Sequence, residues 1–409
     1  MILVAHPVGN ANLRALLDAL DRAGLLEHFI TTIGWSKASY PALSDKIRGK
    51  LRRNYATSAD KIDIHPWREI VRLAAGVIGA DWLTQHESGW ASMDEVWQSI
   101  DRHAACCLRK NAYKGARAVY AYEDCAEQIF IAASELGLRR VYDLPIAYWQ
   151  TAQRLLREEA ERYPDWEFSL EGTRDSEEKL ARKTRELELA EMVICPSNFV
   201  LESLPAVERG SKKCLLAPFG SPDRGAANRP HASIPRPLRI LFAGAMTQRK
   251  GLADVFAAMK MVKSKNVELV IMGSPMREVG WYRERFTNFI HEPPRPHAEV
   301  LDLMRSCDVL VLPSIVEGRA LVQQEAMSCG LPLIVTKNAG GDDLIIEGET
   351  GFLVPIRSPQ AIAEKIDWFS ANRLALDGMG IAAQDRARQF TWAHYGETIV
   401  AELRLLLDK

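Results

Sequence analysis

The stretch "DVLVLPSIVEGRALVQQEAMSCGLPLIVTK", residues 308–337, carries two strand patterns with a helix pattern between them. Its two ends, 308–314 and 331–337, are short runs rich in Val, Leu and Ile that finish in small or turn-forming residues. The segment between them, "ALVQQEAMSCG", has its apolar residues at helical spacing. Strands that are apolar on both faces are typical of parallel sheets covered by helices, so the stretch predicts a βαβ unit.

The same alternation extends through both halves of the chain. In the second half, strand-like runs at 238–245 and 267–273 are separated by a helical pattern. The first half repeats the alternation less regularly, with strand-like runs at 1–7, 116–123, 139–145 and 190–197. We therefore predict an α/β protein with two Rossmann-like parallel-sheet domains that face a cleft.

Composition sets the expected domain boundaries. Residues 221–237 are rich in Pro, Gly and Ala and poor in large apolar residues, which is typical of a linker. The linker separates an amino-terminal domain, 1–220, from a carboxyl-terminal domain, 238–386. Residues 387–409 include a last amphipathic helix, which we expect to return to the amino-terminal domain.

Charge and cysteine usage exclude several functions. The net charge of −1 gives no overall field that recruits nucleic acid, so an anion site must be built locally. The seven cysteines are odd in number and lack C-x-x-C spacing, which disfavours a disulfide framework and a zinc site, and we expect no bound metal. No apolar run is long enough to span a membrane and the first residues do not resemble a signal peptide, so a cytoplasmic location is expected.

The segment after the strand at 308–314 is the first candidate site. Ligands of parallel sheets bind beyond the carboxyl ends of the strands, and two such domains place the site in the cleft between them. Glu317 and Gly318 precede a predicted helix start near Arg319 or Ala320, where free N–H groups and the helix dipole favour a phosphate. Glu317 and Glu325 are placed to accept hydrogen bonds from hydroxyls at the two ends of a sugar–diphosphate–nucleoside. The alternative is that both glutamates are solvated helix residues.

Two further turns could supply contacts to the same ligand. Arg249 and Lys250 follow the strand at 238–245 and stand at the start of a predicted helix. The helix dipole disfavours cations there, so the pair makes sense if both cations bind one anionic ligand. They could also be exposed surface cations. Gly9 and Asn10 follow the first strand and could approach the diphosphate from the other domain, although a glycine there often serves only the turn.

Other motifs point away from competing chemistry. Asp342 and Asp343 suit the start of a short helix better than a metal site. The chain has no GxxxxGK[ST], GxGxxG or GxSxG motif, which removes the usual kinase, dinucleotide and hydrolase interpretations. The basic segment 44–54, flanked by Trp35 and Trp67, predicts either peripheral contact with the inner face of a membrane or a solvated surface.

Several motifs together resemble a known family. Residues 317–355, "EGRALVQQEAMSCGLPLIVTKNAGGDDLIIEGETGFLVP", resemble the two-glutamate signature of retaining GT-B glycosyltransferases of family four, "glycosyl transferases group 1". The segments "FAGAMTQRKG", "ELELAEMVICPSNFVLESL" and "FTWAHYGETI" are similar to three further family segments. The resemblance covers most of residues 186–400.

The resemblance implies a nucleotide-diphosphate-sugar donor, no cofactor and no metal. Glu325 would bind the ribose hydroxyls and Glu317 the sugar hydroxyls near the reacting carbon. Lys250 would neutralise the leaving diphosphate, stabilising the charge that develops there. The distal phosphate would be held by the backbone N–H groups around Arg319, Ala320 and Leu321.

The sequence departs from the family pattern in the carboxyl-terminal domain at two places. Ala245 stands where the family has an arginine, and Arg249 is the candidate substitute. Arg319 stands where the family commonly has a phenylalanine, which would put another cation at the donor mouth.

A third departure lies in the amino-terminal domain. At the place where the family often has a histidine, this chain has Tyr142 and Asp143, and Asp143 is the candidate catalytic residue there. Glu123 and Asp124 are the other polar residues at a strand end.

The expected function is transfer of a hexose-type sugar, with retention, to a glycan, a lipid-linked acceptor or a small molecule, as in polysaccharide biosynthesis. A catalytically weak binding or scaffold subunit of the same fold is one alternative. A nucleotide-sugar epimerase or a phosphorylase of the same fold is another, although no cofactor lysine for a phosphorylase can be identified.

Overall fold

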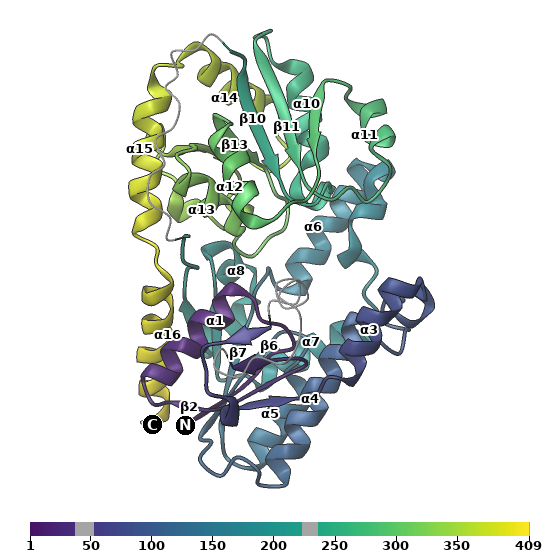
Figure 1. Ribbon diagram of the computed structural model, residues 1–409, viewed down its shortest axis with the longest axis vertical. Coiled ribbons are helices and arrows are strands. Elements are labelled where there is room, and N and C mark those ends of the chain that lie inside the picture. The colour runs from purple at the N-terminus through teal and green to yellow at the C-terminus, as the bar shows by residue number, and fades with distance from the viewer. Residues whose placement is uncertain (37–52, 223–235, 409) are drawn as a thin grey trace.

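The computed structural model describes residues 1–36, 53–222 and 236–408. Figure 1 shows two α/β domains stacked along the long axis of the molecule, each built around its own sheet. The chain crosses to the second domain after residue 222 and returns to the first through its last helix.

The amino-terminal sheet has seven parallel strands in the order β5-β2-β1-β6-β7-β8-β9. The strands are β1 (Ile2–Ala5), β2 (Leu26–Thr31), β5 (Ile62–Ile64), β6 (Ala118–Tyr122), β7 (Arg139–Asp143), β8 (Met192–Cys195) and β9 (Lys213–Leu216). A separate parallel pair joins β3 (Trp35–Ser36) to β4 (Asn54–Tyr55). The sequence pattern did not reveal β2, β5 and β9, because these strands are short or carry polar residues.

Helices cover both faces of this sheet. They are α1 (Ala11–Arg22), α3 (Trp67–Ile78), α4 (Met93–Arg109), α5 (Glu127–Glu135), α6 (Trp149–Arg162), α7 (Glu177–Leu189), α8 (Asn198–Ser203) and α9 (Ala206–Ser211). Short 3₁₀ turns lie at η1 (Ala59–Lys61), η2 (Asp81–Leu83), η3 (Pro164–Ser169) and η4 (Glu171–Thr173). Residues of α4 and α5 pack on one face, and residues of α1 pack on the other.

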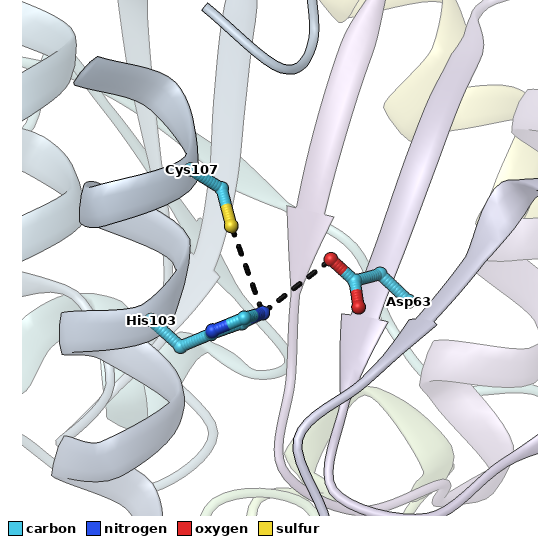
Figure 2. Close-up of side chains that lie close together, drawn as sticks. All are labelled: Asp63, His103 and Cys107. Carbon is cyan, nitrogen blue, oxygen red and sulfur yellow. Dashed lines mark hydrogen bonds and ion pairs between the residues drawn. The ribbon is translucent and has the colours of Figure 1, made fainter. Parts of the chain in front are cut away.

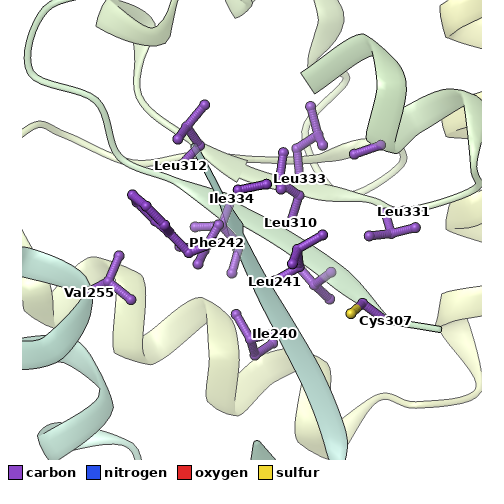
Figure 3. Packing of buried hydrophobic residues seen from close by; sticks show 14 of the residues in the cluster. Ile240, Leu241, Phe242, Val255, Cys307, Leu310, Leu312, Leu331, Leu333 and Ile334 are labelled. Carbon is purple, nitrogen blue, oxygen red and sulfur yellow. The ribbon is translucent and has the colours of Figure 1, made fainter. Parts of the chain in front are cut away.

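The carboxyl-terminal sheet has six parallel strands in the order β12-β11-β10-β13-β14-β15. They are β10 (Leu238–Ala243), β11 (Val267–Met272), β12 (Phe289–Glu292), β13 (Val309–Leu312), β14 (Leu333–Val335) and β15 (Gly351–Leu353). Figure 3 shows the resulting core, in which Phe242, Leu310 and Ile334 from neighbouring strands pack together. The predicted βαβ unit is β13, α13 (Leu321–Ser328) and β14.

The other helices of this domain are α10 (Leu252–Met261), α11 (Val279–Arg285), α12 (His297–Arg305), α14 (Pro359–Ala371) and α15 (Ala375–Arg388). The 3₁₀ turns lie in loops: η5 (Gln248–Lys250) between β10 and α10, and η6 (Lys337–Ala339) and η7 (Asp342–Leu344) between β14 and β15. Two of them, η5 and η7, contain candidate residues from the sequence.

The last helix, α16 (Trp392–Leu407), lies beside α1 of the amino-terminal domain. Its buried residues Ile399 and Leu403 share a core with Leu13 and Leu16 of α1. At Gly396 a Cβ atom would lie 2.6 Å from the Cβ of Ala19, so the two helices approach closely there. The carboxyl terminus therefore ties the two domains together, because α14 and α15 belong to the other core.

Candidate functional site

A cation pair and a glutamate meet at the carboxyl edge of the second sheet. The turn after β10 carries Arg249 and Lys250 in η5, and the loop after β13 carries Glu317. Arg249 Nη1 lies 3.0 Å from Glu317 Oε1, and Lys250 Nζ donates to the same oxygen. The structure thus brings together three candidate residues that follow two separate strands in the sequence.

Glu317 is anionic in this setting although it is almost buried. Burial pulls the pKa of the Glu317 carboxyl upward, but Arg249 and Lys250 outweigh it and hold that pKa below its usual range. Two cations and one carboxylate leave the cluster with one net positive charge. A site with such a charge favours an anionic ligand.

Two glycines allow the loops to close around Lys250. Gly251 has φ +78°, and a Cβ atom there would lie 2.2 Å from the carbonyl oxygen of Pro313 in the loop after β13. Gly244 has φ +144°, and a Cβ atom would lie 2.9 Å from Lys250 Cδ. Side chains larger than hydrogen would push the two loops apart or displace the lysine.

Glu325 projects from α13 toward a different partner. Its Oε1 lies 2.9 Å from Nε2 of His297, the first residue of α12. The sequence pattern did not reveal this histidine, because it opens an ordinary helix 28 residues before Glu325. The two glutamates of the βαβ unit are therefore held differently, Glu317 by cations and Glu325 by a half-exposed imidazole.

The expectation that Arg319 adds a cation at the donor mouth is wrong. Its side chain is fully buried, with Nη1 2.7 Å from Asp343 Oδ1 and Nε donating to Gln324 Oε1 at 2.9 Å. Its guanidinium also lies over the ring of Phe390, 4.9 Å from the centroid. The guanidinium charge is neutralised inside the domain, because the side chain turns toward the end of α15 and away from the interdomain cavity.

The backbone around Gly318 also differs from the expectation of a phosphate cradle. A Cβ at Gly318 would lie 1.6 Å from the carbonyl oxygen of Pro145, so the close approach is to the other domain. The Gly318 carbonyl accepts a hydrogen bond from Ser197 Oγ at 2.6 Å. The Ala320 N–H donates to the carbonyl of Ala339 at 3.1 Å and is not available to a phosphate. The helix start is then at Leu321, whose N–H belongs to the first turn of α13.

Asp143 does not occupy the place expected of a catalytic residue. Side chains alternate along a strand, so Asp143 shares the sheet face of Val141, which packs toward α1 and α16. Asp143 is 3% exposed, and burial raises the pKa of its carboxyl to about 7, although the neighbouring Tyr120 opposes this shift. The carboxyl is therefore part of the interior beneath the last helix.

Gly9 and Asn10 serve the turn that contains them. Asn10 caps α1, its Oδ1 accepting from the Leu13 N–H at 3.0 Å. A Cβ at Gly9 would lie 2.4 Å from the hydroxyl oxygen of Tyr55, so glycine is needed for packing. These contacts account for both residues without a ligand.

The aspartate pair and the basic segment have local roles where they are described. Asp343 neutralises Arg319, and Asp342 Oδ2 accepts from Nδ2 of Asn198 at 3.2 Å across the domain boundary. Most of segment 44–54 lies outside the described residues. Within it, Arg53 is nearly buried and pairs with Glu69 at 2.6 Å, so this cation does not face a lipid surface.

A cavity of about 430 Å³ lies between the domains beside the cation pair. From the second domain it is lined by Ala245, Thr247, Arg249, Ser274 and Val316, and from the first by residues that include Trp149, Gln153 and Lys183. Its place at the ends of β10, β11 and β13 is the one predicted for the ligand of two facing parallel sheets.

Lys183 connects this cavity to the strand end of the first domain. Its Nζ lies 3.3 Å from Glu123 Oε1 and 3.4 Å from Asp124 Oδ2. Burial raises the pKa of the Glu123 carboxyl, although Lys183 opposes this shift. Glu123 and Asp124, and not Asp143, are therefore the strand-end carboxylates that hold a cavity residue in place.

Comparison with solved structures identifies the architecture. Sucrose-phosphate synthase from Thermosynechococcus elongatus superposes over 100% of this chain and 98% of that chain, with a TM-score of 0.68 and 18% identity. The Anabaena protein HepE in complex with UDP has a TM-score of 0.61 and 15% identity, over 98% of both chains. These likenesses show that the chain adopts the two-domain GT-B fold.

The sequence of the second domain is similar to a known family. Residues 223–386 match the model of the glycosyl transferases group 1 family. D-inositol 3-phosphate glycosyltransferase of Corynebacterium diphtheriae is 26% identical over 217 residues, 48% of this chain and 49% of that protein. The corresponding protein of Paenarthrobacter aurescens is 29% identical over 169 residues, 39% and 41% of the two chains. The chain thus spans about half the length of the curated relatives it matches.

Proposed function

We propose that the protein transfers a hexose-type sugar from a nucleoside-diphosphate donor to an acceptor, with retention at the anomeric carbon and without a catalytic metal. The observation that carries the proposal is the cluster of Arg249, Lys250 and Glu317 beside the interdomain cavity. Its positive charge suits a diphosphate, and its carboxylate suits sugar hydroxyls.

Each part of a donor has a residue suited to it. Lys250 and Arg249 hold the diphosphate, and the N–H groups at the start of α13 add the positive end of a helix dipole. Glu317 accepts from sugar hydroxyls once the cations turn to the phosphates. Glu325 accepts from the ribose hydroxyls, with His297 as its neighbour.

In the transfer step, the bond between the anomeric carbon and the phosphate oxygen breaks and a bond to the acceptor oxygen forms on the same face. The acceptor proton passes to an oxygen of the departing diphosphate, so no protein base is needed. Lys250 and Arg249 stabilise the negative charge that develops on the leaving group, which is commonly the largest electrostatic contribution to catalysis.

The names of the similar proteins support this choice of substrates. HepE has been solved with UDP and with UDP-glucose. The similar structures also include an α,α-trehalose-phosphate synthase from Burkholderia vietnamiensis, described as UDP-forming, with a TM-score of 0.61, 13% identity and 99% and 97% coverage. A UDP-sugar donor is therefore the first to test, and phosphorylated sugars or polyols are the first acceptors.

Transfer is tested by incubating the protein with UDP-, GDP- and ADP-sugars, with EDTA present, and a panel of sugar phosphates, inositol phosphate, oligosaccharides and lipid-linked sugars. Acceptor-dependent release of nucleoside diphosphate supports the proposal, and proton NMR of the product then reads the anomeric configuration. Nucleotide binding without turnover on any acceptor would favour the scaffold subunit. Conversion of the donor sugar without transfer would favour an epimerase.

The first domain offers a reason to include lipid-linked acceptors in that panel. Among the described residues, no helix is long and apolar enough to cross a bilayer. Helix α3 and the turn after it nevertheless expose Trp67, Val77, Ile78 and Trp82, with Val77 85% exposed. Exposed aromatic and aliphatic side chains on an amphipathic helix suit the interface of a lipid surface.

The lipid contact is tested by sedimentation with vesicles of phosphatidylcholine and phosphatidylglycerol. We expect the wild-type protein to sediment with them and a Trp67→Ser/Trp82→Ser variant to stay in solution. Equal sedimentation of both proteins, or of neither, would contradict a role for this helix.

A further inference from the structure

Three side chains with metal-ligating atoms converge outside the interdomain cavity. His103 and Cys107 lie four residues apart on α4, so both side chains project from one face of the helix. Asp63 lies on β5, the edge strand of the first sheet. Figure 2 shows the three side chains pointing toward one another, and their ligand atoms all lie within 4.8 Å of each other.

The separations agree with those around a tetrahedral ion. His103 Nε2 lies 3.4 Å from Asp63 Oδ2 and 3.6 Å from Cys107 Sγ. A Zn²⁺ ion with bonds of about 2.0 Å to nitrogen and oxygen and about 2.3 Å to sulfur holds neighbouring ligand atoms roughly 3.3–3.6 Å apart. The nitrogen–oxygen distance is long for a direct hydrogen bond, whose usual range is about 2.7–3.2 Å.

Neighbouring side chains hold two of the three groups in place. The Tyr113 hydroxyl donates to Asp63 Oδ2 at 2.5 Å. The ring of His65 stacks on the ring of His103, with centroids 4.5 Å apart and planes 15° apart. Hydrogen-bonding partners such as Tyr113 orient ligands in metal sites, and their loss commonly weakens metal binding.

We propose that Asp63, His103 and Cys107 bind one thiophilic divalent ion, with Zn²⁺ as the best match and water in the fourth position. A carboxylate, an imidazole and a thiolate are the three ligand types that Zn²⁺ takes in proteins. The ion would cross-link the short edge strand β5 to α4. It is a stabilising site, since its ligands are separate from the residues that line the interdomain cavity.

The site is consistent with the absence of C-x-x-C spacing in the chain. The ligands come from a helix and from a strand 40 residues upstream, so only the H-x-x-x-C spacing on α4 is visible locally. Such a pair is common by chance, and the fold alone supplies the third ligand.

The test uses tag-free, metal-stripped, reduced full-length protein titrated with Co²⁺, which reports thiolate ligation by near-ultraviolet charge-transfer absorption. We expect one equivalent of Co²⁺ to bind and to produce this absorption band. Zn²⁺ should displace the Co²⁺ and raise the melting temperature of the protein. Cys107→Ser should remove the band. It should also lower the metal affinity by more than about tenfold, because even the loss of a partner outside the ligand shell typically costs at least that much. His103→Gln provides a second variant should Cys107→Ser fold poorly.

Cys106→Ser is the matched control, because Cys106 is the exposed neighbour on the same helix. The control should keep the band, the affinity and the Zn²⁺-dependent rise in melting temperature. Absence of the band in the wild-type protein, or its loss in Cys106→Ser and retention in Cys107→Ser, would overturn the proposal. The Cys107→Ser variant should bind nucleoside diphosphate like the wild type, which separates this site from the transfer site.

Discussion

Replacing Glu317 by Gln should tighten the binding of nucleoside diphosphate while slowing sugar transfer. Lys250 and Arg249 both contact the Glu317 carboxylate in the structure, so a diphosphate must compete for cations that are already paired. The substitution keeps the size of the side chain and removes its charge. The net charge of the three-residue cluster then rises from one to two.

The magnitude follows from the geometry. A phosphate that contacts the same cations lies on the order of 6 Å from the carboxylate, twice the 3.0 Å contact between Arg249 and Glu317. At an effective dielectric constant of about 20, repulsion at about 6 Å is roughly 3 kcal/mol. The freed cations gain hydration in the ligand-free variant, which offsets part of the gain in binding free energy. We expect a net gain of about 1.4 kcal/mol, which is about tenfold in affinity.

Isothermal titration calorimetry with UDP, GDP and ADP measures the affinity, and initial rates at saturating donor measure turnover. Glu325→Gln is the matched control, since it removes the same charge from the same βαβ unit. We expect it to weaken binding about tenfold, because the ribose loses a charge-assisted partner. Tightening in both variants would indicate a general electrostatic effect. Unchanged or weaker binding in a folded Glu317→Gln protein would refute contact between the diphosphate and the two cations.

Three further predictions concern residues with structural roles. Arg319→Met should lower the free energy of unfolding by about 3 kcal/mol, because it leaves Asp343 without its buried partner. Denaturant titration measures this loss. A large change in nucleotide affinity would instead indicate that Arg319 contacts the donor. Burial holds the pKa of Asp143 near 7, above the unfolded value of about 3.9, so the folded state loses stability as pH rises through this window. Near pH 4, Asp143→Asn should therefore have the melting temperature of the wild type. As the pH rises to 8, its melting temperature should increasingly exceed that of the wild type, and a difference that does not change with pH would be contrary evidence. Gly251→Ala should destabilise more than Gly24→Ala, since both glycines have positive φ but only the former meets a neighbouring carbonyl; equal losses in melting temperature would mean that the contact has no cost.

Much of the fold could be predicted from local patterns. Buried parallel strands are continuous runs of Val, Leu and Ile, and the helices between them have a different period, so the central strands of both sheets are visible in the sequence. Edge strands such as β5 and β15 are short and partly exposed, and their patterns resemble loops. The same rule that ligands bind beyond the carboxyl ends of strands pointed to Glu317 and to the Arg249–Lys250 pair.

The sequence by itself determined that the chain has two parallel-sheet domains and which strand ends carry charged residues, because both depend on spacing of a few residues. Only the tertiary structure decided where each charge points. Arg319 looked like a donor-site cation and is paired inside the domain, and Asp143 is turned to the interior by the alternation of its strand. Likewise, Asp63 joins His103 and Cys107 only through the packing of β5 on α4. Contacts of this kind join residues far apart in the chain, and their direction depends on how whole elements pack.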